Sequence, residues 1–276
     1  TKYQIPISAV TFNQTFTESS TPVKNLHNSD IFEGSVINKA NPANFTFKCL
    51  VLKENRLSTL FNCILDLSYC DLYIETKQDV FKLENAVFTS TSFPITRGAA
   101  FSLDISGEAA RLRRLGDFGN AIIPGTEYIT DSTILIAKNN EIVLGGDNIA
   151  NHAIQATIEI QNNITWIPYV TINGAINTST MYPSAFYLED RIVAGSVSRY
   201  VTPETDEDLQ TYSSSTTLRI KVGQEIGGTF YGFDFNIGSC SYTNRLNTGA
   251  IFTQNYDWRM TDNSTSLDNI ITYITT

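Results

Sequence analysis

The sequence contains few of the residues that build catalytic and metal sites. Its 276 residues include two histidines, His27 and His152, and four cysteines, and neither an H-E-x-x-H nor a C-x-x-C pattern occurs. These patterns are common local signatures of bound zinc or of a reactive cysteine pair. The sequence therefore predicts a protein with no catalytic residues, no bound metal and no cofactor.

Long apolar runs are also missing. No stretch approaches the roughly 18 consecutive apolar residues that a membrane-spanning helix needs, and the first residues lack the basic and apolar stretches of a secretion signal. We expect neither a membrane span nor a signal peptide. The cysteines lack the spacing of a disulfide framework, so buried free thiols are favoured over disulfides. They are Cys49, Cys63, Cys70 and Cys240.

Positive charge is scarce. The chain has 19 Lys and Arg against 28 Asp and Glu, a net charge of −9. Nucleic-acid-binding proteins use basic surfaces to neutralise phosphates, so specific DNA recognition is not expected. The excess of acidic residues is unevenly distributed. Residues 1–125 hold 12 basic and 12 acidic side chains, whereas residues 126–276 hold 7 basic and 16 acidic side chains. The net charge therefore belongs to the second part of the chain.

The residues that are abundant favour strands. Hydrophobic residues make up 42% of the chain, with 13 Tyr and 16 Phe. Apolar and polar residues alternate in many short segments rich in β-branched and aromatic side chains, which is typical of half-buried strands. Clear examples are residues 44–51, 71–75, 100–105, 156–160 and 217–222. The fold class predicted is mainly β.

Helical spacing is found in few places. Leu57, Leu60, Phe61, Ile64 and Leu65 repeat at the interval of one helix face and predict a short helix. Residues 203–210, with Pro and acids at the start, suit a second helix. Residues 267–274 are compatible with a terminal helix or a last strand, because their β-branched content opposes their helical spacing.

Short strings recur in the same order along the chain. Residues 31–36 match 192–197, and 97–101 match 248–252, with two further matches, 72–74 with 218–220 and 81–83 with 233–235, between them. We interpret this as an internal duplication, although short apolar strings also match by chance in β proteins. The prediction is two tandem β-sandwich domains, 1–125 and 126–276, each with a short flanking helix. The Gly- and Pro-rich residues 116–125 mark the boundary.

Three other clusters have both a functional and a structural interpretation. Acidic residues at 204–208 lack the spacing of a calcium loop and suit a solvated face or a helix start. Residues 256–259 combine acid and aromatic side chains as sugar-binding clefts do, although a core Trp with rim charges is the favoured explanation. We expect the basic cluster of Arg111, Arg113 and Arg114 either to contact an acidic neighbouring surface or to lie on a solvated face.

The duplicated strings, together with residues 195–200, the helix at 57–65 and the segments after Gly98 and Gly249, resemble the major tail tube proteins of tailed phages. The resemblance implies a β-sandwich with a flanking helix, six such domains in a ring, and inner strands joined into one barrel. A chain with two fused tube domains would form a pseudo-sixfold ring from three copies. The long connection at 113–150 departs from simpler members of the family.

The resemblance implies a structural virion protein without enzymatic activity, a stacked-ring tail tube that conducts the genome during ejection. The implied partners are further copies of the chain, other tail proteins, and genomic DNA that passes without specific binding. Its implied location is the virion tail, assembled in the host cytoplasm. The charge split predicts an acidic bore that repels DNA. The alternatives are another ring-forming tail or head-completion protein, or a carbohydrate-binding β-sandwich using Trp166, Tyr256, Asp257 and Trp258.

Overall fold

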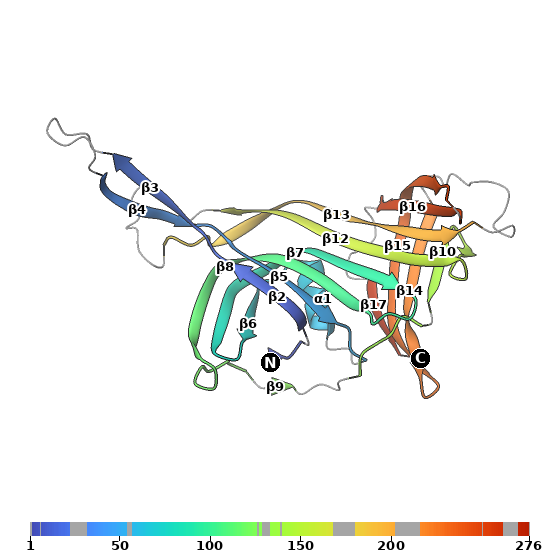
Figure 1. Cartoon of the computed structure of the whole chain (residues 1–276), viewed down its shortest axis with the longest axis horizontal. Coiled ribbons are helices and arrows are strands. Elements are labelled where there is room, and N and C mark those ends of the chain that lie inside the picture. Colours follow the sequence, from blue (N-terminus) through green and yellow to red (C-terminus); the bar gives the residue numbers. More distant parts are fainter. Residues whose placement is uncertain are drawn as a thin grey trace.

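The computed structural model describes residues 2–5, 7–22, 32–53, 57–125, 127–128, 133–138, 140–167, 180–201, 216–249, 251–261 and 270–275. The chain is mainly β, as the alternating pattern predicts, and its strands form one large curled antiparallel sheet with two small ones (Figure 1). In the part of the chain covered by these ranges, no helix has the length and apolar character needed to cross a membrane.

The first set of strands in the large sheet has the order β2-β5-β8-β7-β6. Two strands outside it, β3 (Phe16–Pro22) and β4 (Phe32–Ala40), pair in a hairpin that projects at the left of Figure 1. A parallel pair joins β1 (Lys2–Tyr3) to β9 (Glu127–Tyr128). The five strands of the set are β2 (Ile7–Asn13), β5 (Ala43–Leu50), β6 (Cys70–Glu75), β7 (Asp79–Thr96) and β8 (Ser102–Asp117).

The second set has the order β12-β13-β16-β15-β14, which repeats the first order strand for strand along the chain. Three further strands, β10 (Glu141–Leu144), β11 (Asp147–Asn148) and β17 (Ile271–Thr275), pair with its members or with each other. Residues 267–269 lie outside the described residues, and 271–275 are a strand. The five strands are β12 (Ala153–Ile167), β13 (Ala185–Tyr200), β14 (Thr216–Ile226), β15 (Thr229–Asn247) and β16 (Thr253–Met260).

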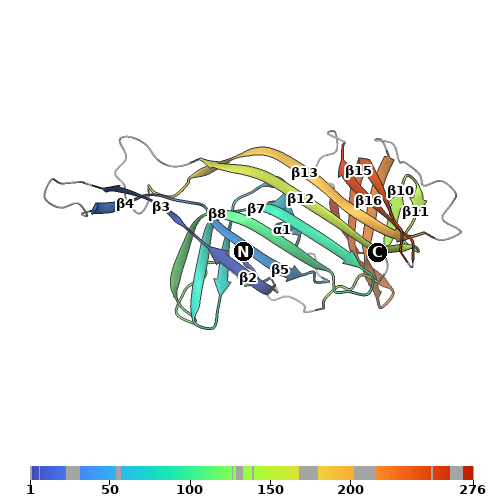
Figure 2. The same cartoon turned by 45° about the horizontal axis from the view of Figure 1, so that its top comes forward.

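The two sets join into one sheet at β7 and β12. Seven residues of β7, 90–96, pair antiparallel with residues 155–161 of β12. Figure 2 shows β13, β12, β7, β8, β5 and β2 side by side in the order that the pairing gives. The second set therefore continues the first through an ordinary strand ladder.

The one helix among the described residues, α1 (Leu57–Asp66), packs under this sheet, as the helical spacing predicts. Its buried residues Leu60, Phe61, Ile64 and Leu65 belong to a core that draws on both sets. The Phe61 ring lies 5.9 Å from that of Phe93 on β7 and 5.2 Å from that of Phe233 on β15. The helix therefore ties the two sets together. Residues 203–210, where a second helix is predicted, lie outside the described residues.

The connection between the sets also bridges them. The Leu135 N–H donates to the Val51 carbonyl at 2.9 Å, and the Leu135 carbonyl accepts from the Phe101 N–H at 2.8 Å. The Ala137 N–H donates to the Ala99 carbonyl at 3.0 Å. Lys138 then donates to the Gly223 carbonyl in the second set, and β10 pairs with β14. Part of the long connection predicted at 113–150 is thus strand, since β8 extends to Asp117.

Three of the four matched strings occupy corresponding strands or turns. Residues 72–74 and 218–220 lie on β6 and β14, 81–83 and 233–235 on β7 and β15, and the third pair precedes β8 and β16. The fourth match does not correspond. Residues 32–36 pair with β3 in the separate hairpin, whereas 192–197 lie on β13, whose counterpart by strand order is β5. This fourth match is therefore a chance resemblance between two short apolar strings.

In each set a glycine lies opposite an aromatic residue on a neighbouring strand. Phe45 on β5 lies opposite Gly107 on β8, and Gly195 on β13 lies opposite Trp258 on β16. A Cβ at Gly107 would be 2.9 Å from Phe45 Cε1, and one at Gly195 would be 2.6 Å from Trp258 Cζ2, so each glycine makes room for the ring. The glycine and the aromatic residue have exchanged strands between the two sets.

Candidate functional site

Eight strands form the central part of the large sheet, in the order β2, β5, β8, β7, β12, β13, β16, β15. One face packs on the core through residues such as Phe45, Phe93, Ile158 and Tyr256, each at most 2% exposed. Side chains alternate along a strand, so their neighbours point to the opposite face, which we name the open face. It includes Ala9, Thr11, Asn13, Asn44, Thr46, Lys48, Ser90, Ser92, Pro94, Asp104, Ser106, Glu108, Gln155, Thr157, Glu159, Gln161, Ile192, Ala194, Ser196, Ser198, Thr243, Arg245, Asn255, Asp257 and Arg259.

Hydroxyl and amide groups dominate the open face, and many bond one another across strands. The hydroxyls of Thr11 and Thr46 lie 2.5 Å apart, and those of Thr157 and Ser196 lie 2.9 Å apart. Ser198 donates to the Asn255 side-chain oxygen at 2.7 Å. The hydroxyl and amide groups of this face are uncharged and can form hydrogen bonds with water or with a passing polar molecule.

Charges on the open face are few and mostly paired. Lys48 lies 3.4 Å from Asp104, and Arg245 forms an ion pair with Asp257. Both pairs are solvent-exposed, so each contributes little to stability, about 0–1 kcal/mol. Their effect is to keep the local charge near zero.

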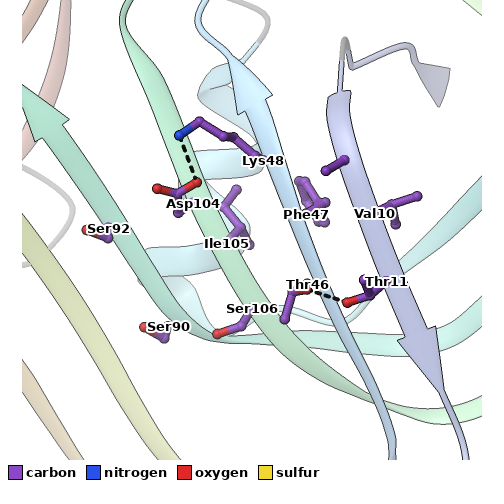
Figure 3. A pocket seen from close by; sticks show the side chains of 11 residues that line it. Val10, Thr11, Thr46, Phe47, Lys48, Ser90, Ser92, Asp104, Ile105 and Ser106 are labelled. Carbon is purple, nitrogen blue, oxygen red and sulfur yellow. Dashed lines mark hydrogen bonds and ion pairs between the residues drawn. The ribbon is translucent and has the colours of Figure 1, made fainter.

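A shallow depression of about 330 Å³ crosses β2, β5, β8 and β7 on this face (Figure 3). Its polar side chains are Thr11, Thr46, Ser90, Ser92, Ser106 and the Lys48–Asp104 pair. In Figure 3 the serines of β7 lie on one side of that ion pair and the threonine pair on the other. The lining contains no histidine, the general base that most often activates a serine nucleophile.

Clusters of metal-binding side chains are missing from the described ranges. No group of three or more His, Cys, Asp or Glu side chains there is placed to hold a metal ion. His152 is half-buried and belongs to the turn before β12, and His27 lies outside the described residues.

The aromatic and acidic residues considered for sugar binding do not form a cleft. Tyr256 and Trp258 are 0% and 2% exposed and belong to the core, whereas Asp257 between them points to the open face. Trp166 lies in a separate small cluster with Leu67, Val87 and Ala110. Because side chains alternate between the two faces of the sheet along β16, Asp257 lies on the face opposite to both rings. These residues therefore cannot bind one sugar together.

Trp166 donates its indole N–H to the Glu108 carboxylate at 2.7 Å. Burial raises the pKa of Glu108 above its ordinary value, and the hydrogen bond from Trp166 offsets part of that rise. This is a half-buried acid with one neutral donor.

The basic cluster is neutralised within its own set. Arg113 bonds to Glu84 at 3.0 Å, and Arg114 bonds to Asp79 and Asp117, each at 2.5 Å. Arg111 lies over the Tyr182 ring at 4.6 Å. The acids that these arginines meet come from β7 and β8 and not from the acidic second part of the chain.

All four cysteines are free thiols. Cys49 and Cys240 are buried, and burial raises the pKa of Cys49 to about 12 and that of Cys240 to about 11. Cys63 on α1 and Cys70 on β6 are half-buried and hydrogen-bonded to each other. The bond from Cys70 lowers the pKa of Cys63 to about 7 and raises that of Cys70.

Two sheet edges flank the open face. On β2, residues 9–13 pair with β5 on one side, and on β15, residues 243–247 pair with β16 on one side. No other described strand pairs with the second side of either segment. Sequence patterns did not indicate these edges, because alternation identifies a strand but not its neighbours.

The described residues form a sheet with a polar open face and two edges at which a further strand can pair. Among protein families, the model of the Bacteriophage Baseplate Tube Protein Family matches residues 3–275. The chain belongs to this family. It is therefore a structural component of the phage tail. No curated protein matches the chain.

Proposed function

We propose that three copies of this chain form a closed ring, and that such rings stack into a tube segment through which the genome leaves the virion. The observation that carries this proposal is the repeated strand order, since β2-β5-β8-β7 and β12-β13-β16-β15 place two equivalent four-strand units on one open face. Three chains then supply six units. Closing the sheet removes edges that would otherwise aggregate.

The duplication of domains 1–125 and 126–276 is part of this proposal. Its support is the common strand order, the three corresponding strings and the glycine–aromatic pair of each set. The hydroxyl pairs Thr11–Thr46 and Thr157–Ser196 occupy corresponding strands as well. Agreement in order, strings and cross-strand pairs favours descent from one ancestral unit over chance matches.

The open face would line the bore. Its ion pairs Lys48–Asp104 and Arg245–Asp257 cancel, Glu159 and Arg259 are of opposite sign, and the half-buried Glu108 adds one acid. The face is thus closer to neutral than the acidic bore that the charge split predicts. DNA would slide because no net positive charge condenses on its phosphates, and repulsion by an acidic wall is not required.

Sedimentation and negative-stain microscopy of the purified protein test the ring. Three chains of 30.7 kDa give a ring of about 92 kDa, and we expect such rings and short stacks with a central hole. The purified assembly should not retain duplex DNA on a filter at low salt. A monomer at all concentrations would contradict the proposal, and single rings that never stack would favour a head-completion role.

A further inference from the structure

The joint between β7 and β12 is an internal example of how one unit meets the next. Residues 90–96 of β7 extend past β6 and accept residues 155–161 of β12 along their second side. By strand order β15 is the counterpart of β7, and β2 is the counterpart of β12. The edges of β15 and β2 described above are therefore the two halves of the same joint, separated to opposite ends of the eight-strand sheet.

Cross-strand pairs fix the register between the sets. Aligning Phe45–Gly107 with Gly195–Trp258 places Thr46 on Ser196 and Ser106 on Asp257. Thr46 bonds to Thr11, and Ser196 bonds to Thr157, so the hydroxyl pairs confirm this register independently and make Thr11 the counterpart of Thr157. In the same register Ser90, opposite Ser106, matches Thr243, opposite Asp257.

The internal joint then gives the pairing of the external one. Thr157 lies opposite Pro94, and Ile158 lies opposite Phe93. Their counterparts are Thr11 opposite Asn247 and Phe12 opposite Leu246. The next pair, Glu159 opposite Ser92, corresponds to Asn13 opposite Arg245.

We propose that β2 of one copy adds antiparallel to the edge of β15 in a second copy, with Phe12 opposite Leu246 and Thr11 opposite Asn247. This joint rests on the proposed ring and specifies its subunit contact. Each copy supplies one edge of each kind, so the contact is head-to-tail and repeats until the ring closes.

The chemistry of the two edges fits this pairing. In the internal joint Phe93 and Ile158 are both 0% exposed and pack against each other across the strands. Leu246 is 42% exposed in the single chain, and Phe12 is half-buried beside the Phe81 ring at 5.1 Å. Pairing would cover an apolar side chain that the single chain leaves in water, and cross-strand apolar pairs are the usual stabilising unit of sheets.

Disulfide trapping tests the register. Thr11→Cys with Asn247→Cys places two sulfurs on directly opposed residues, within the 4.4–6.8 Å Cα separation that a disulfide requires. Thr11→Cys with Thr243→Cys is the matched control, because four residues along a strand displace the second sulfur by about 13 Å. Under mild oxidation we expect the first pair to give covalent dimers and trimers at least ~tenfold more abundantly than the control.

A second variant tests the apolar contact. Leu246→Lys places a charge in the joint while changing an exposed side chain of the single chain, so we expect normal folding with at least ~tenfold weaker association, equivalent to about 1.4 kcal/mol. Ile122→Lys, at a position 86% exposed and outside every strand, is the control and should assemble as the wild type does.

The outcomes separate this joint from the ring itself. Suppose that the wild type forms rings. If neither cysteine variant then gives covalent oligomers, or if the control variant gives them, the joint is overturned and the proposed function stands. Unchanged assembly of Leu246→Lys would also overturn the joint. A wild-type protein that remains monomeric in sedimentation would overturn the proposed function first.

Discussion

Replacing Gly107 by alanine tests the packing of the glycine–aromatic pair. The added Cβ would lie 2.9 Å from Phe45 Cε1 and inside contact distance of the Val87 carbonyl oxygen, whereas carbon atoms normally approach to about 3.5–4.0 Å. Phe45 is 2% exposed, and the Val87 oxygen belongs to the neighbouring strand, so neither is free to move aside. The strands must separate, and overpacking of this kind costs about 1–3 kcal/mol.

Thermal unfolding followed by circular dichroism measures this cost. A chain of this size loses about 2–4 °C for each kcal/mol, so Gly107→Ala should melt roughly 2–12 °C below the wild type. Gly249→Ala is the control, because its Cβ would meet only the Ile251 oxygen at 3.7 Å, an ordinary contact. Equal melting temperatures for the two variants would refute the argument that each glycine exists to admit a ring.

Three further predictions concern buried polar groups. Glu108→Gln keeps an acceptor for Trp166 and removes a half-buried charge. Because the folded pKa of Glu108 is raised, the stability that the acid contributes is fully present at low pH and lost as pH rises. In urea titrations the variant should therefore be more stable than the wild type at pH 7 and equally stable at pH 3. Asn162→Leu removes the amide that donates to carbonyls of α1 and β7 at 3.2 and 3.0 Å. The free energy of unfolding should fall by about 2–3 kcal/mol in the same assay. Cys63, with a pKa of about 7, should react with iodoacetamide increasingly as pH rises through 7, and Cys70→Ala should move that transition toward pH 9; an unchanged midpoint would disprove the thiol–thiol bond.

Local features of the fold could be predicted from the sequence. The helix at 57–65 and strands such as 44–51 follow from side-chain spacing, because the period of burial is set within each element. The same reasoning applied to Gln254, Tyr256 and Trp258 would have assigned both rings to the core, since they alternate with Asn255 and Asp257. Spacing within a strand was the informative signal there, and chemical resemblance to a sugar cleft was not.

The neighbours of each strand could not be predicted. That β7 pairs with β12, and that residues 192–197 correspond to β5 and not to residues 31–36, depends on contacts far apart in the sequence. Antiparallel ladders form between many alternating segments with similar energy, so register is decided by the packed core and the turns. The open face, which eight strands share, was beyond sequence reasoning for the same reason.

The internal β7–β12 joint affects how fast and at what concentration a ring would form. Strand addition between separate molecules must offset lost translational freedom, whereas two units on one chain meet at a fixed, high effective concentration. In the proposed ring, half of the six joints form when each chain folds, so ring formation varies with the third power of protein concentration. Halving the concentration would lower the ring population about eightfold, against about 64-fold for six separate units. A phage that makes this protein in small amounts would still obtain closed rings.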